Sequence, residues 1–235
     1  MSLHKARVSD DRARLPPRVA AALAAAEIPP SKLGPARRAR LTDSERELYF
    51  WILRRFATRG RPGSAETREA AKSLGVDAGR ALETLAREDL VHLDRSGEIV
   101  VAYPFSGRPT AHRVRFRSGH EADAMCAIDA LGIAAMFDEP IEIASRDPLT
   151  QEEIQVELQP DGDGNWQPQE AVVVAGTSRG RQSFRGCCPA LNFFASARNA
   201  ERWLEAHPGL HGHVISMGEA IAAGRAVFDD VFVSR

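Results

Sequence analysis

Cysteine is scarce in this chain of 235 residues, which contains only three. An odd number of cysteines does not make a complete disulfide framework, so we expect a reducing, cytoplasmic setting. Neither a Cys-x-x-Cys nor a His-x-x-His pair occurs, which disfavours a zinc site. The apolar stretches stay short of the roughly 18 residues of a membrane span, and the N-terminus has no apolar signal-peptide core. We therefore expect no membrane partner.

Lysine is almost absent, with three residues against 28 arginines, and the net charge is −1. The charge is uneven, because residues 1–62 hold 14 Lys and Arg against six Asp and Glu, whereas the remainder is acidic. A basic first quarter is compatible with nucleic-acid binding. The length and a hydrophobic content of 43% suffice for one large domain or two small ones.

Local signals divide the chain into three parts and indicate an α+β protein. Residues 1–41 are expected to be an N-terminal extension and linker, with a mobile, Pro- and Arg-rich connector at 29–40. Residues 42–106 predict a winged-helix-like module of three short helices followed by two β-type runs. Residues 107–235 alternate between strand and helix signals and predict an α+β catalytic domain, with a mixed β-sheet and flanking helices.

Within the last part, periodicity and turn residues locate the individual elements. The pattern predicts a loop at 161–165 and a short strand near 182–184. It further predicts strands at 110–116, 139–146, 152–160 and 170–176, helices at 125–137 and 196–209, and a strand followed by a helix in 213–232.

All three cysteines stand where chemistry can use them. Cys126 lies three residues before Asp129 in the predicted helix 125–137, so the thiol and the carboxyl group share one helix face. Cys187 and Cys188 are adjacent, some 60 residues further along. Two separated thiols and a nearby carboxylate suit a soft, thiol-seeking substrate such as mercury. The competing interpretation is that a lone helix cysteine is buried filler.

Two local features bear on the charge of these thiols. Glu121 and Asp123, expected in the first turn of the helix that carries Cys126, oppose ionisation of that thiol. Pro189, directly after Cys188, predicts a helical turn whose exposed amides would stabilise the Cys188 thiolate. These signals favour Cys188 as the more ionised thiol.

Four short motifs resemble those of the organomercurial (alkylmercury) lyases in order and spacing. The similarity covers roughly residues 43–230. The motifs are Ala102-Tyr-Pro-Phe-Ser106, Met125-Cys-Ala-Ile-Asp-Ala-Leu-Gly132, Asn192-Phe-Phe-Ala-Ser196, and the Trp203 helix that ends in His207-Pro-Gly209.

The resemblance implies a site of two cysteines and one aspartate. The first cysteine falls on Cys126 and the aspartate on Asp129. Counting back from Phe193 and Phe194 places the second cysteine on Cys188, and leaves Cys187 as a further candidate mercury ligand. Two features depart from the family: Met125 stands where the best-known members have an aromatic residue, and no extra cysteine occurs near Ser145.

The activity implied by the resemblance is protonolysis of a carbon–mercury bond, with release of a hydrocarbon and Hg(II). Thiolates are the softest side-chain ligands for mercury, and a carboxyl group can relay the proton. The resemblance implies no cofactor. It does imply an organomercurial substrate, low-molecular-weight thiols as acceptors of the product, and hand-off of Hg(II) to a mercuric reductase.

Other functions stay open at this point. One is a paralogue that binds thiol-seeking metals without lyase activity. Another is a winged-helix DNA-binding regulator that responds to metal, although the short helix after Ser64 carries nearly balanced charges and is poor for tracking phosphates. A hydrolase would pair Cys126 with His112 or His120.

The adjacent cysteines generate a first prediction. Cys188→Ser should abolish turnover of an organomercurial, because one thiolate cannot both hold mercury and weaken its bond to carbon. Cys187→Ser should leave most of the activity. Hydrocarbon release by the two purified variants measures both effects, and equal losses would contradict the placement on Cys188.

Overall fold

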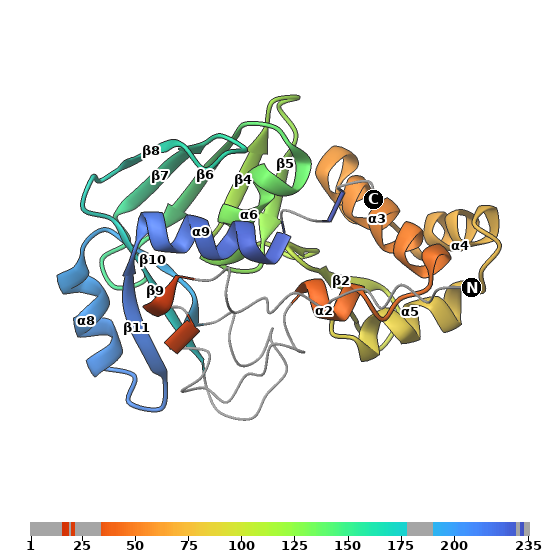
Figure 1. Cartoon of the computed structure of the whole chain (residues 1–235), viewed down its shortest axis with the longest axis horizontal. Coiled ribbons are helices and arrows are strands. Elements are labelled where there is room, and N and C mark those ends of the chain that lie inside the picture. Colours follow the sequence, from red (N-terminus) through yellow and green to blue (C-terminus); the bar gives the residue numbers. More distant parts are fainter. Residues whose placement is uncertain (1–15, 19, 22–33, 178–189, 229–230, 233–235) are drawn as a thin grey trace, which may run out of the picture.

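The structure is a computed structural model that describes residues 16–18, 20–21, 34–177, 190–228 and 231–232 (Figure 1). The fold is α+β, as predicted, with helices at its N-terminal side followed by antiparallel sheets and flanking helices. Among the helices in these ranges, none is both long enough and apolar enough to cross a membrane.

Three helices near the start of the range 34–177 are here called the helical module. They are α3 (Asp43–Arg59), α4 (Ser64–Ser73) and α5 (Ala78–Arg87). The predicted cap of α3 is present, because the Glu45 amide donates to Thr42 Oγ1 at 3.3 Å and the Thr42 amide donates to Glu45 Oε2 at 2.9 Å. The hairpin of β1 (Val91–Leu93) and β2 (Ile99–Ala102) follows, as the sequence indicates.

Part of the stretch that was expected to be a mobile connector is helical. Residues Gly34–Arg38 form α2, which packs against α9 (Met217–Phe228). Arg38 is buried, and its guanidinium donates to the carbonyl of Val227 at 2.9 Å. The prediction of a mobile connector is therefore wrong for residues 34–38, because their contact with α9 holds them in place.

Eight strands form one continuous sheet in the order β1-β2-β3-β5-β4-β6-β7-β8. Every pairing in it is antiparallel, so the prediction of a mixed sheet is wrong. Parallel neighbours need long crossovers, whereas short turns connect most of these strands directly. The remaining strands are β3 (Phe105–Ser106), β4 (Arg113–Phe116), β5 (Glu121–Ala124), β6 (Ile141–Arg146), β7 (Glu153–Leu158) and β8 (Gly164–Gln167).

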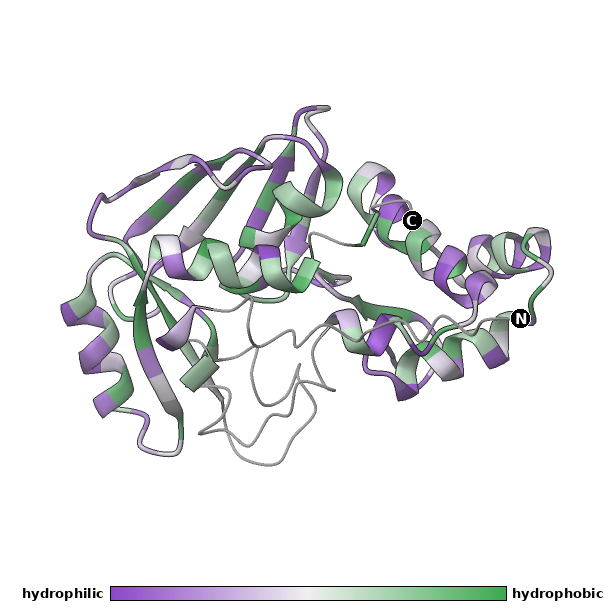
Figure 2. Ribbon diagram, in the orientation of Figure 1, coloured by the Kyte–Doolittle hydropathy of each residue, from purple (hydrophilic) through white to green (hydrophobic). Residues whose placement is uncertain are grey.

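The sheet buries one face and leaves the other to solvent. Alternate residues of β6 and β7 are buried, which Figure 2 shows as bands of green and purple along the strands. Charged pairs cross the open face, including Arg115 with Glu121 at 2.9 Å and with Glu142 at 3.3 Å.

Two strands of this large sheet were not predicted. β5 occupies part of the stretch assigned to the start of a helix, and β8 begins inside the predicted loop 161–165. Both are four residues long and poor in β-branched side chains, so pairing with a neighbouring strand, rather than propensity, decides their conformation.

A second sheet of three antiparallel strands has the order β10-β9-β11. Its strands are β10 (Phe193–Phe194), β9 (Val172–Thr177) and β11 (His211–Ser216). Helix α8 (Ala197–Glu205) covers it through a small core of Val174, Phe194, Ala200 and Trp203. The strand predicted near 182–184 lies outside the described residues.

Two helices, α6 (Ala127–Phe137) and α9, pack closely across the centre of the molecule (Figure 1). α6 is buried along most of its surface, as expected of a helix that is apolar all round. Gly132 and Gly224 let the two backbones meet, since a methyl group on Gly224 would lie 2.7 Å from the Gly132 nitrogen and 2.8 Å from the Ile128 carbonyl oxygen.

This contact generates a prediction about stability. Gly224→Ala should lower the free energy of unfolding by about 1–3 kcal/mol, because the three atoms nearest to the added methyl group are backbone atoms. Gly218→Ala is the matched control: it lies in the same helix with nothing within 4 Å. That control should be neutral or stabilising by roughly 0.5–1 kcal/mol. Urea denaturation compares the two variants, and equal effects would contradict close packing at Gly224.

Candidate active site

Cys126 is the N-cap of α6 and not, as predicted, a residue within the helix. It follows β5 at a strand-to-helix turn, with extended backbone angles, and α6 begins at Ala127. Its sulfur accepts the amide hydrogen of Asp129 at 3.4 Å. A helix N-terminus favours negative charge, so this position stabilises a thiolate.

The carboxyl group of Asp129 completes this cap. The Cys126 thiol donates to Asp129 Oδ2 at 2.9 Å. Both side chains are buried, with 1% of Cys126 and 7% of Asp129 exposed. The predicted proximity of the thiol and the carboxyl group is therefore correct, although it arises from capping geometry. Proton transfer between the two needs no further movement of the chain.

The acidic residues expected beside Cys126 lie elsewhere. Glu121 and Asp123 belong to β5, on the sheet face opposite to the buried Ala122 and Ala124. Arg115 hydrogen-bonds to Glu121, and this contact is the main reason that the pKa of Glu121 is lowered. The expectation that these acids oppose ionisation of Cys126 from the first helical turn is wrong, because strand pairing moves them to the open face.

Four hydrogen bonds fix the backbone on both sides of Cys126. Ala124 donates to the His112 carbonyl at 2.8 Å and accepts from Thr110 Oγ1 at 2.7 Å. The Met125 amide donates to the Pro104 carbonyl, and the Ala127 amide donates to the Leu191 carbonyl, both at 2.9 Å. Segments remote in the sequence thus hold the thiol in place.

Asn192 and Phe193, which follow the cysteine pair in the sequence, contact buried polar groups. His112 Nδ1 lies 2.9 Å from Ser145 Oγ, and the side chain of Asn192 hydrogen-bonds to the same ring. Phe193 packs edge-on against His112, with ring centroids 5.6 Å apart. Burial lowers the pKa of His112 from 6.5 to about 4, so this histidine is neutral near pH 7.

Asp147 provides a second anchor, which the sequence indicated only as a turn near Pro148. The carboxylate is fully buried, and it accepts the amides of Leu149 and Thr150 through Oδ1. Its Oδ2 accepts the Ala195 amide and the Asn199 side chain, both at 2.9 Å. An aspartate followed by Pro-Leu-Thr is a signal for an Asx turn, but the contacts to Ala195 and Asn199 have no local signature.

The other residues predicted for the site either lie outside the described ranges or have partners other than Cys126. Cys187 and Cys188, together with the helical turn predicted after Cys188, lie outside the described residues. Within the described ranges, no three His, Cys, Asp or Glu side chains are grouped as metal ligands. His112 is engaged by Ser145 and Asn192, and His120 by the Phe56 carbonyl at 3.0 Å. These contacts direct both histidines away from the role of a base for Cys126.

Three of the four sequence motifs meet around Cys126. Pro104 and Leu191, from the first motif and from just before the third, accept the amides that flank the cysteine. The Trp203 motif contacts the third motif instead, because Trp203 packs on Phe194. Helix α8 ends at Glu205, just before His207. The His-Pro-Gly sequence is a helix stop, as predicted.

Comparisons with known proteins point to one family. A family model described as alkylmercury lyase matches residues 105–229. The alkylmercury lyase of Bacillus cereus is 30% identical over 181 residues, which cover 76% of this chain and 81% of that protein. The alkylmercury lyase of Pseudomonas putida is 28% identical over 164 residues, which cover 69% and 75% of the two chains.

One solved structure shares the fold. It is described as the mercury-bound form of MerB2 and superposes with a TM-score of 0.68 at 20% sequence identity. The match covers 83% of this chain and 95% of that one.

The buried His112 generates a prediction about pH. Because its pKa is lower in the folded state than in the unfolded chain, protonation favours unfolding as the pH falls from about 6.5 to about 4. The loss of stability should reach roughly 3 kcal/mol. His112→Asn should remove this dependence, whereas Ser145→Ala, which retains the histidine, should keep it. Urea denaturation across this pH range measures the slopes, and identical slopes for wild type and His112→Asn would exclude His112 as the source.

Proposed function

The chain belongs to the alkylmercury lyase family, and on that premise we propose that it cleaves the carbon–mercury bond of organomercurials by protonolysis, with Cys126, Cys188 and Asp129 as the reacting residues. The observation that carries the proposal is the buried contact of 2.9 Å between Cys126 Sγ and Asp129 Oδ2 at the start of α6. Family membership implies a part in mercury resistance.

In the first step, the Cys126 sulfur displaces the exchangeable ligand of R–Hg–X. A mercury–sulfur bond forms, the bond from mercury to X breaks, and the thiol proton passes to the Asp129 carboxylate. The amide of Asp129 already points at the sulfur, which favours the thiolate that attacks. Burial of the site strengthens these interactions because little water competes with them.

In the second step, Cys188 loses its proton to the displaced ligand X or to solvent and adds a second sulfur to mercury as a thiolate. Two thiolates raise the electron density on the metal and on the attached carbon. Leu191, three residues after Cys188, accepts the Ala127 amide, and three residues span at most roughly 11 Å. This short separation in sequence from a residue that contacts the Cys126 turn supports Cys188 as the second ligand, and Cys187 is a further candidate ligand for the product ion.

In the last step, Asp129 returns the proton to carbon. The electron pair of the carbon–mercury bond becomes the new carbon–hydrogen bond, and the hydrocarbon leaves. Mercury stays in the +2 state, bound to two sulfurs, so no oxidant or reductant is needed. Low-molecular-weight thiols of a reducing cytoplasm then take the ion, and a mercuric reductase is the expected onward acceptor.

The helical module and the β1–β2 hairpin are winged-helix-like, and we assign them a structural role within the proposed domain 42–106. Support comes from the sheet, since the hairpin pairs through β2 with β3, and β3 pairs with β5 of the proposed catalytic domain, 107–235. Exposed residues of α4 alternate in charge, with Glu66, Arg68, Glu69 and Lys72. This surface does not favour binding to phosphates.

Incubation of the purified protein with phenylmercury or methylmercury and excess thiol tests the proposed function. Release of benzene or methane is the expected result. Binding of the organomercurial without release of hydrocarbon would identify a metal-binding paralogue instead.

The role of Asp129 generates a further prediction. Asp129→Asn keeps the size of the side chain and removes the group that carries the proton, so hydrocarbon release should fall by roughly 10²–10⁴-fold. Mercury binding by the thiols should survive. Asp138→Asn makes the same change at the exposed end of α6 and should leave release unchanged. Cleavage by Asp129→Asn at the rate of the wild type would contradict the assigned role.

A further inference from the structure

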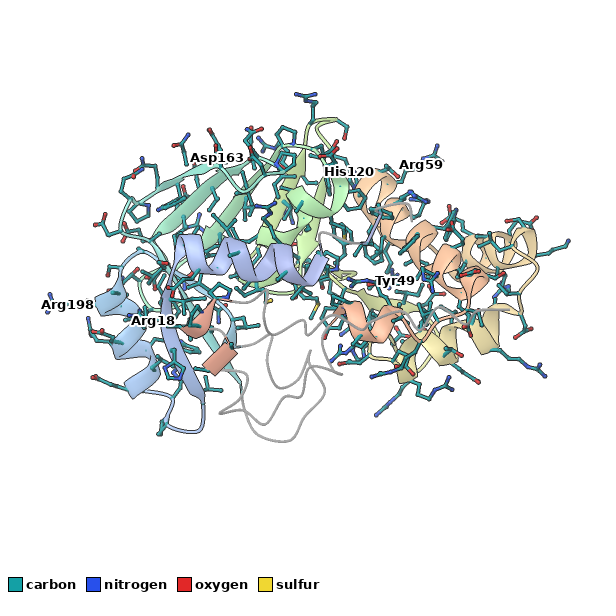
Figure 3. All side chains as sticks on the ribbon, in the orientation of Figure 1. Arg18, Tyr49, Arg59, His120, Asp163 and Arg198 are labelled. Atoms are coloured by element: carbon teal, nitrogen blue, oxygen red, sulfur yellow. The ribbon has the colours of Figure 1, made fainter. Side chains whose placement is uncertain are left out.

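A buried tyrosine connects the helical module to the turn that carries Cys126. Tyr49 lies on α3 with no exposed surface, and its hydroxyl donates to the carbonyl of Tyr103 at 2.6 Å. Figure 3 labels Tyr49 where the helical module meets the strands. A buried hydroxyl needs a hydrogen-bond partner, and here the partner is a backbone carbonyl 54 residues away in the sequence.

Tyr103 begins a segment that runs directly along the backbone before Cys126. The next residue, Pro104, accepts the Met125 amide at 2.9 Å, and Phe105 pairs with Ala124 in the sheet. The Tyr49 hydroxyl is therefore connected through residues 103–105 to the peptide that immediately precedes the cysteine. Loss of the hydroxyl would leave the Tyr103 carbonyl without this donor in a buried position, which favours local rearrangement.

A second hydrogen bond at the same junction provides a comparison. His120, labelled in Figure 3, lies in the turn between β4 and β5 and donates from Nε2 to the Phe56 carbonyl of α3 at 3.0 Å. This bond also joins the helical module to the sheet, but among the described residues neither His120 nor Phe56 hydrogen-bonds to residues 103–105, and Phe56 meets Phe105 by ring stacking at 5.5 Å. Removal of each bond in turn therefore distinguishes an effect on docking of the helical module from an effect on the position of Cys126.

We propose that Tyr49 is a positioning residue for the reaction at Cys126, and this inference rests on the proposed function. Through Tyr103 and Pro104, it holds the Met125 peptide so that the Cys126 thiol faces Asp129 and the amides of α6. The helical module thus contributes to catalysis from outside the site, without contact with substrate.

The test is Tyr49→Phe, which keeps the ring and removes only the hydroxyl. With phenylmercury and excess thiol, kcat should fall by about 10- to 100-fold while KM stays unchanged, since misplaced reacting groups slow the chemical step. Amide hydrogen exchange, measured by mass spectrometry on peptides that span residues 124–127, should become faster in the variant.

His120→Phe is the matched control. It removes the other hydrogen bond at the junction. It also keeps an aromatic ring next to Phe116, with which the His120 ring stacks at a centroid distance of 6.5 Å. Its kcat and its exchange at 124–127 should stay close to those of the wild type. An equal fall in kcat in both variants, or a wild-type kcat in Tyr49→Phe, would overturn the positioning role.

Failure of the proposed lyase function gives a result that differs from failure of the Tyr49 positioning role. If the wild type releases no hydrocarbon from phenylmercury or methylmercury, the lyase assignment fails, and the exchange measurement still decides whether Tyr49 holds the Cys126 turn. Unchanged exchange at residues 124–127 in Tyr49→Phe would refute the structural coupling by itself.

Discussion

The site depends on the backbone hydrogen bonds that hold residues 124–127. Their acceptors and donors come from Pro104, Thr110, His112 and Leu191, which lie in separate parts of the chain. A strand-to-helix turn held in this way gives Cys126 one backbone conformation, in which its sulfur faces the first amides of α6 and the Asp129 carboxyl group. The conformational entropy of this turn is already lost on folding. The thiol therefore needs no further ordering for the proposed reaction.

The surrounding fold makes it possible to bury two ionisable groups there. An isolated buried carboxylate would be costly, but Asp129 accepts a hydrogen bond from the Cys126 thiol inside an otherwise apolar helix. Close contact between Gly132 and Gly224 lets α9 cover this helix without a gap. The apolar face of the large sheet lies on the other side, so the pair is enclosed by packed layers.

The anchors of residues 192–199 follow the same principle. His112 and Asp147 are buried polar groups, and each has at least one hydrogen-bond partner in residues 192–199. Buried groups of this kind are stable only when their hydrogen bonds are made, so they specify one position for the segment. The helical module adds its own contacts, through Tyr49 and His120, to the strands that lead to Cys126.

The sequence by itself determined the local features: the cap at Thr42, the three helices and hairpin, the proximity of Cys126 and Asp129, and, through four short motifs, the family. These depend on contacts within a few residues, which a pattern of spacing records. Only the tertiary structure decided that Cys126 caps α6, that residues 121–124 form a strand, and that all pairings are antiparallel. It also decided that Tyr49 hydrogen-bonds to Tyr103, and that His112 and Asp147 hydrogen-bond to residues 192–199. Each of these depends on a partner remote in the sequence, and strand pairing and burial override local propensity where such partners exist.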